Sequence, residues 1–135
     1  MKQKKGIKSK KGIGALLFLG IMLCFNLSVY AAGNRAFTYD FKHQLALKGS
    51  YTATKSDATF QFYTDYNGSD GYLQVRQYYA WNGGLDEYVR TRYVYATQGA
   101  RRDLSVPSEI GTAFTYEFWK DEDGAYIRGN GDLQY

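Results

Sequence analysis

Apolar and polar side chains alternate with a period of two residues through much of the sequence after residue 35. In the clearest run, residues 36–48, large apolar or aromatic side chains occupy every second position and mostly polar ones lie between. This period places one set of side chains on each face of a β-strand. No stretch after residue 35 keeps apolar side chains at the helical positions i, i+3, i+4 and i+7 over three turns. The pattern predicts strands throughout this part of the chain.

Short clusters of Gly, Asn, Asp and Ser separate the alternating stretches at intervals of roughly ten residues, as turns do. The predicted strands cover 36–48, 51–54, 58–64, 72–81, 87–96, 112–119 and a last stretch that begins at 125. Six or seven short strands favour one all-β domain, folded as a small antiparallel β-sandwich or a partly open barrel. The alternation argues against a parallel sheet, whose strands are apolar on both faces.

Residues 97–111 break the alternation and hold the only proline, Pro107. A connection of this length in a compact domain usually either crosses between sheets or carries function, and both interpretations stay open. Its Arg101 and Arg102 form a secondary basic loop, which we take as a second candidate for ligand binding.

Residues 72–96 form a predicted hairpin whose register follows from the length of its turn. A two-residue turn would mix apolar and charged side chains on one face, for example by pairing Val75 with Arg90. A three-residue turn, 82–84, separates the faces and ends on a glycine, which suits the left-handed backbone of such loops. In that register one face pairs Gln74 with Arg92, Arg76 with Arg90, and Tyr78 with Tyr88.

This predicted face places Arg76 directly opposite Arg90, and like charges at such a position destabilise a ladder. Forked guanidinium groups bind carboxylates and phosphates, and tyrosine rings stack on other rings. Two interpretations follow. The face binds an anionic or sugar-containing polymer such as cell-wall material, or it is an ordinary solvated face whose arginines pair with nearby carboxylates.

The first 31 residues have the three parts of a secretory signal peptide. A lysine-rich start precedes an apolar stretch, 13–25, that is short for a membrane span, and small residues follow. We expect cleavage between Ala31 and Ala32. The alternative is an uncleaved anchor helix over 13–32. Cleavage predicts a secreted, extracellular protein, free in the medium or associated with the cell wall, whose leader engages the export machinery and signal peptidase.

The formal charge of +4 comes from the leader. Six of the 17 basic residues lie before Gly12, and no acidic residue occurs among the first 31. The 11 basic residues that remain are outnumbered by 13 acidic ones, so the rest of the chain carries a net charge of −2. This balance gives no support for nucleic-acid binding. The 104 residues from Ala32 onward fit a single domain.

Catalytic chemistry has few candidates after the leader. The only cysteine, Cys24, lies in the leader, and the only histidine, His43, falls on the apolar face of its predicted strand, where we expect a satisfied core residue. The single histidine excludes a histidine-rich zinc site within 32–135. The expected core position of His43 and the lack of a cysteine argue against nucleophile–histidine chemistry there. The acidic turn 121–124 resembles a calcium loop but lacks the twelve-residue pattern. We expect no enzyme activity, no metal and no cofactor.

These features together predict a secreted, non-catalytic protein that binds cell-envelope or matrix polymer, either anionic or glycan. The residues after Ala31 include 13 Tyr, 6 Phe and 2 Trp, a composition suited to ring contacts. The alternative is a secreted antagonistic protein, bacteriocin-like in its exported, cysteine-free and tyrosine-rich character. Binding to isolated cell walls without growth inhibition would favour the first function, and killing of related strains the second.

Overall fold

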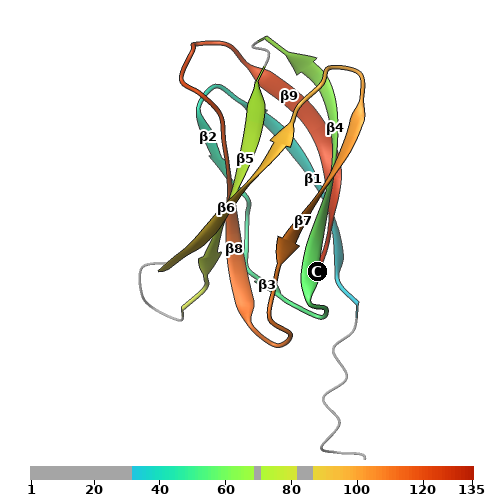
Figure 1. Cartoon of the computed structure of the whole chain (residues 1–135), viewed down its shortest axis with the longest axis vertical. Helices are drawn as coiled ribbons and strands as arrows, with labels where there is room; N and C mark the ends of the chain where they lie inside the picture. Colours follow the sequence, from blue (N-terminus) through green and yellow to red (C-terminus); the bar gives the residue numbers. More distant parts are fainter. Residues whose placement is uncertain (1–31, 69–70, 82–86) are drawn as a thin grey trace, which may run out of the picture. The chain divides into compact units, whose positions relative to one another are not determined.

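The computed structural model describes residues 32–68, 71–81 and 87–135, which form nine β-strands and no helix. The strands are β1 (Asn34–Phe41), β2 (Gln44–Ala46), β3 (Tyr51–Thr52), β4 (Asp57–Asn67), β5 (Tyr72–Tyr79), β6 (Glu87–Tyr95), β7 (Arg101–Pro107), β8 (Ala113–Trp119) and β9 (Ile127–Gln134). They form two antiparallel sheets that pack together, so the predicted all-β sandwich is confirmed (Figure 1). The leader and the predicted turn 82–84 lie outside the described residues. Within those residues, no helix is long and apolar enough to cross a membrane.

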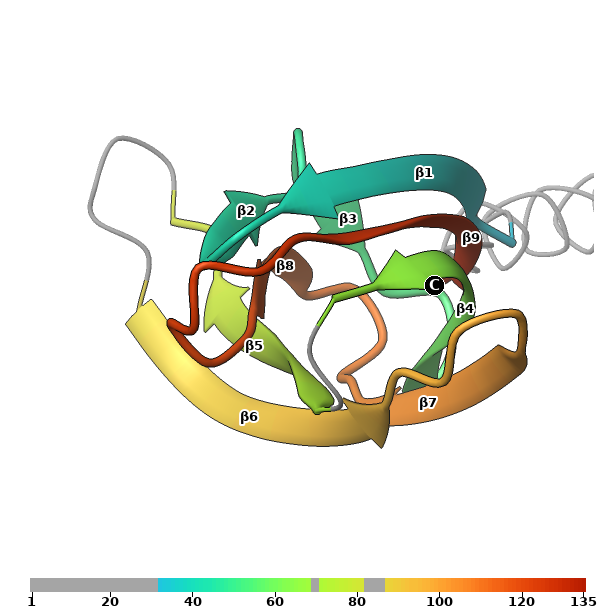
Figure 2. The ribbon, with the colours of Figure 1, turned by 90° about the horizontal axis from the view of Figure 1, so that it is seen from above.

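The four-stranded sheet, here sheet A, has the strand order β1-β9-β4-β7, and the five-stranded sheet, sheet B, has the order β2-β8-β5-β6, with β3 also paired to β8. The edge strands of the two sheets approach each other on both sides of the sandwich. Strands β1 and β2 lie close on one side, and β6 and β7 on the other (Figure 2). Each side therefore presents two strand edges from different sheets.

The predicted single strand over 36–48 is wrong, because the chain bends at residues 42–43 and changes sheets. Its first half becomes β1 of sheet A and its second half β2 of sheet B. Phe37, Tyr39 and Phe41 are buried, and Leu45 packs against the same core from the other sheet. Both halves point their apolar side chains at one core, so the alternation continues through the bend.

The prediction of a strandless connection over 97–111 is also wrong, because this segment contains β7. The chain does cross here from sheet B to sheet A, between the end of β6 and the start of β7. Only Leu104 and Val106 face the core from this edge strand. An alternation with two apolar residues is too short to be recognised in the sequence. Arg101 and Arg102 therefore lie in a strand and not in a loop.

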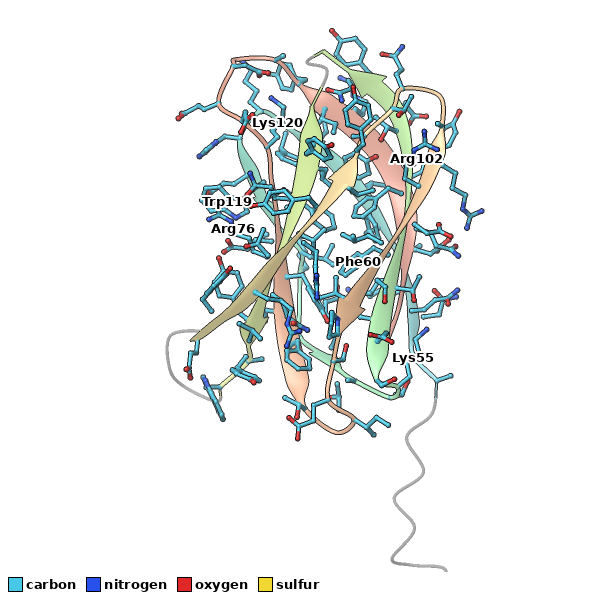
Figure 3. The ribbon with its side chains drawn as sticks, viewed as in Figure 1. Lys55, Phe60, Arg76, Arg102, Trp119 and Lys120 are labelled. Carbon is cyan, nitrogen blue, oxygen red and sulfur yellow. The ribbon has the colours of Figure 1, made fainter. Side chains whose placement is uncertain are left out.

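Aromatic rings from both sheets interlock in the core. The Phe118 ring of β8 lies 5.2 Å from that of Phe37, 5.9 Å from Phe60 and 5.3 Å from Phe62, measured between ring centroids. Phe60 lies in the interior between the sheets (Figure 3). Tilted and edge-on ring pairs at these distances stabilise the core beyond simple burial. Phe118 of sheet B therefore joins the two sheets at their centre.

Strand β9 carries two inward-facing glycines, Gly129 and Gly131, that leave room for aromatic rings of the core. Gly131 lies between Phe37 on β1 and Phe62 on β4, whose rings meet across it at 5.5 Å. A Cβ at Gly131 would overlap both the Gln61 carbonyl oxygen and the Phe37 ring. The glycine is thus required by close packing, although its backbone is not in the left-handed region.

Candidate functional site

The register of the β5–β6 hairpin differs from the prediction by one residue over most of its length. Tyr78 pairs with Tyr88 as expected, but a β-bulge adds Val89 to β6 at this point. Beyond the bulge Gln77 pairs with Arg90, and the shift continues to the far end of the hairpin. One added residue moves every later side chain of that strand to the opposite face.

The bulge divides the predicted arginine face. Arg76 lies opposite Thr91 of β6, whereas Arg90 pairs with the fully buried Gln77 and therefore faces the core side of the sheet. The predicted like-charge pair of Arg76 and Arg90 is wrong. Two groups result, and they lie on opposite sides of β6. The outer face keeps Gln74, Arg76, Tyr78 and Tyr88, and the core-facing side of β6 takes Arg90 and Arg92.

The outer face of sheet B is rich in aromatic side chains, and we call it the aromatic face. Its aromatic members are Tyr72 and Tyr78 of β5, Tyr88, Tyr93 and Tyr95 of β6, and Trp119 of β8. Exposed fractions are 59% for Tyr72, 56% for Tyr88, 59% for Tyr93 and 42% for Tyr95. Cross-strand rings meet edge-on, at 5.2 Å for Tyr72 and Tyr95 and at 5.9 Å for Tyr78 and Tyr88. The hairpin therefore presents an ordered row of exposed phenol rings to solvent.

A cluster of polar groups lies beside these rings. The Arg76 guanidinium carbon lies 3.7 Å from the centroid of the Trp119 ring, a close cation–π contact (Figure 3). One oxygen of Glu117, Oε2, accepts a hydrogen bond from the Trp119 indole at 2.8 Å and another from the Tyr78 hydroxyl at 2.9 Å. Arg76 also donates to Gln74 at 3.4 Å. These contacts fix the orientation of the indole and of the guanidinium.

The same cluster affects the ionisation of Tyr78. Burial raises the pKa of its hydroxyl above the ordinary value of 10.0, and the hydrogen bond to Glu117 and the charge of that carboxylate raise it further, against a smaller opposing effect of Arg76. Tyr78 therefore remains a neutral hydrogen-bond donor at physiological pH.

Sequence reasoning missed Glu117 and Trp119 as members of this surface. Both stand at outward positions of the alternating run that became β8, and that periodicity was the available signal. Glu117 and Trp119 lie close to Arg76 because β8 pairs with β5. These two strands are separated by more than thirty residues in the chain. No local pattern reports that pairing.

Arg90 and Arg92, which we call the arginine edge, lie on the core-facing side of edge strand β6. Arg90 is half-buried, and its Nε has no hydrogen-bond partner, while Arg92 is exposed. No carboxylate within the described ranges forms an ion pair with either. On β7, Arg102 donates to Thr97 at 3.3 Å. Arg101 points to the other face, where Asp103 lies 3.9 Å away, so the predicted basic pair does not form one cluster.

His43 lies half-buried at the bend between β1 and β2, not within the core as expected. Its ring meets the Trp119 ring edge-on at 5.0 Å. Its Nδ1 is buried without a partner, so the expected satisfied histidine is also not observed. The position makes His43 a neighbour of the aromatic face.

The acidic turn 121–124 is organised around a lysine. Lys120 is only 4% exposed, and its ammonium group donates to Asp123 Oδ1 at 2.6 Å and to the carbonyl oxygens of Asp121 and Ala125, both at 2.9 Å. A fourth bond reaches the Lys42 carbonyl at 3.2 Å. An internal cation thus occupies the centre of this turn. No group of three or more potential metal ligands occurs within the described part of the chain.

The fold and the exposed rings together define an antiparallel β-sandwich domain with an aromatic outer sheet face. No protein-family model matches the sequence, and a search of curated proteins returns no match.

Proposed function

We propose that this chain is a secreted, non-catalytic protein that acts outside the cell and binds an anionic glycan polymer of the cell envelope or matrix. The observation that carries the proposal is the row of four tyrosines on the outer face of the β5–β6 hairpin, each more than 40% exposed. Large rings on a solvated strand face contribute little to the fold, and contiguous exposed aromatic surface usually marks a binding site.

The flatness of a sheet face suits an extended polymer. Side chains two residues apart on one strand lie roughly 7 Å apart, so successive rings offer successive contacts along a chain of sugars. Phenol rings supply an apolar face for the C–H surface of a sugar and a hydroxyl for its oxygens. Trp119 and Arg76 extend this surface across β5 to β8.

The arginine edge accounts for the anionic part of the ligand. Tyr88, Tyr93 and Tyr95 lie on one side of β6, and Arg90 and Arg92 lie on the other side of the same edge strand. A polymer along this edge reaches both sides. Guanidinium groups without a carboxylate partner favour phosphate or carboxylate groups of a ligand.

The surroundings of Glu117 support binding and not hydrolysis. Glycoside hydrolysis uses two carboxyl groups that flank the scissile bond. Across the ladder, Glu117 has Ala46 on one side and Arg76 on the other, and its Oε2 is already bonded to two donors. This carboxylate positions neighbouring rings.

Retention on purified cell-wall material tests the proposal. The double variant Tyr88→Ser/Tyr93→Ser should lose at least about tenfold in affinity, since central aromatic contacts dominate binding energy. The matched control is Tyr63→Ser/Tyr66→Ser, which removes two exposed tyrosines from β4 of sheet A and should bind as the parent does. Equal retention of both variants would overturn the assignment. Growth inhibition of related strains without retention would instead favour the antagonistic function.

Secretion is tested separately. Mass spectrometry of protein from the culture medium should show a chain that begins at Ala32. An intact leader in the membrane fraction would contradict cleavage, and would leave the polymer assay unaffected.

A further inference from the structure

A cavity of about 320 Å³ opens on the side of the sandwich where β1 and β2 lie close together. Its apolar lining comes from Phe37 of β1, Leu45 and Leu47 in and after β2, and Tyr51 of β3. The lining also includes the cationic side chains Arg35 and Lys48 and the smaller residues Ala36, Thr38 and Ala46. Strands β1 and β2 lie on the opposite side of the sandwich from β6, which carries the arginine edge (Figure 2).

The topology explains why the space exists. Among the residues that the structure describes, β1 pairs only with β9 and β2 only with β8, so neither has a strand partner on its edge toward the cavity. The chain after β2 then turns at Gly49, whose φ of 86° lies in the left-handed region. The Tyr51 hydroxyl donates to the Lys48 carbonyl at 2.8 Å and ties this turn to the cavity wall. The walls of the cavity are thus fixed by this hydrogen bond and by the packing of their side chains against the core.

The charge around the cavity is one-sided. The Arg35 guanidinium lies 5.7 Å from the centroid of the Tyr51 ring, and both Arg35 and Lys48 are exposed to solvent. Neither forms an ion pair with a carboxylate among the residues that the structure describes. Two cations therefore line the cavity without an ion pair to a described carboxylate.

We propose that this cavity binds a small anionic amphiphile, a single alkyl chain that ends in a carboxylate or a phosphate. The apolar walls take the chain, and Arg35 and Lys48 take the head group. Small-molecule sites have volumes of roughly 300 to 1,000 Å³, so this cavity fits one short chain and not a two-chain lipid. The site does not depend on the polymer-binding function proposed above, because it uses other residues on another side.

Titration by NMR tests the chemistry of the ligand. Decanoate, added to the purified protein below its micelle concentration, should shift the methyl signals of Leu45 and Leu47 in a saturable way. Decyl phosphate should do the same, and the stronger of the two identifies the head group. Uncharged decanol should bind at least about tenfold more weakly, and decyltrimethylammonium more weakly still. Equal binding of all four compounds, or no shift at either leucine, would overturn the proposal.

A pair of charge variants tests the two cations. Arg35→Gln/Lys48→Gln should weaken decanoate binding at least about tenfold and leave decanol binding unchanged. Lys55→Gln/Arg128→Gln removes the same charge elsewhere and should keep the parent's affinity. An equal loss in both variants would show general attraction by net charge and would contradict the site. Shifts confined to β1 backbone amides, with the leucine methyls unmoved, would indicate a peptide strand on the free edge and would also contradict it.

Discussion

The outer faces of the two sheets follow the same alternation but carry different side chains. On sheet A the outward positions of β1 and β9 hold no aromatic ring and mostly polar or charged groups, and Arg128 forms an exposed ion pair with Asp40 at 3.2 Å. On sheet B the corresponding positions of β5 and β6 hold exposed tyrosines. Both sheets bury an aromatic inner face in the same core. The difference is confined to the side that does not pack.

This comparison separates what the fold requires from what it tolerates. Strands β1 and β9 show that polar outward positions are compatible with a stable sheet in this sandwich, so the tyrosines of β5 and β6 are not needed for strand pairing. On sheet A, exposed tyrosines occur at Tyr63 and Tyr66 of β4. Exposed ion pairs such as Arg128–Asp40 contribute about 0 to 1 kcal/mol. The fold therefore does not explain the exposed rings of the aromatic face, which supports a role for this face in binding.

The largest effect on stability is expected at Gly131, on the inner face of sheet A. Gly131→Ala forces Cβ against the backbone carbonyl of Gln61, and backbone cannot move without disturbing the β4–β9 ladder. We expect a loss of about 3 kcal/mol or more in the free energy of unfolding, measured by urea denaturation. Gly71→Ala is the control, because a Cβ there meets nothing within 4 Å and stability should hold. Similar stabilities of the two variants would contradict the close packing of β9.

A smaller loss is expected at Lys120, which ties the connection from sheet B to sheet A. Lys120→Met keeps an apolar stem of similar length but removes the ammonium donor from three carbonyl groups and from Asp123. Asp123 keeps the hydrogen bond from the Ala125 N–H. Since Asp123 is partly exposed and can regain water, we expect a cost of about 2 kcal/mol. A chelator should leave the melting temperature of the parent unchanged. A melting temperature that falls with chelator would show that the turn needs a metal.

The alternation in the sequence was enough to predict the fold class and most strands, because burial of one face imposes a period of two. It could not reveal the bend after Phe41, since both halves of that run serve one core and the pattern never changes phase. It could not reveal β7 either, because an edge strand with two apolar residues resembles a loop. These failures concern three-dimensional arrangement and not local preference.

The candidate site was less predictable for a related reason. A single extra residue, Val89, moved Arg90 and Arg92 to the opposite side of β6, and a sequence tolerates a bulge without showing it. Tyr78 and Tyr88 were paired correctly because they precede the bulge when counted from the turn. Glu117 joined the site only through the long-range pairing of β8 with β5.

Removing exposed tyrosines should affect stability less than either change above. Tyr93→Ser on sheet B and Tyr63→Ser on sheet A should each change the free energy of unfolding by less than about 1 kcal/mol, as exposed strand positions do. Urea denaturation provides the measurement, and the variants serve as controls for each other. A loss above that limit for Tyr93→Ser alone would mean that the aromatic face supports the fold, which would remove the main argument for its role in binding.

The smallest effect is expected in the ionisation of Tyr78. Burial is the main cause of its raised pKa, with Glu117 second, so Glu117→Gln should lower this pKa without bringing it to the ordinary value of 10.0. The signal of a ¹³C-labelled tyrosine ring reports it, and Tyr116, whose pKa is raised mainly by burial, should titrate as in the parent. A raised folded-state pKa means that the folded protein holds this proton more tightly than the unfolded chain. Its contribution to stability is therefore complete below pH 10 and is lost as pH rises through the folded-state pKa. In Glu117→Gln, the stability lost as pH rises through the folded-state pKa of Tyr78 should be smaller. An unchanged titration of Tyr78 in this variant would show that the carboxylate does not act on the hydroxyl.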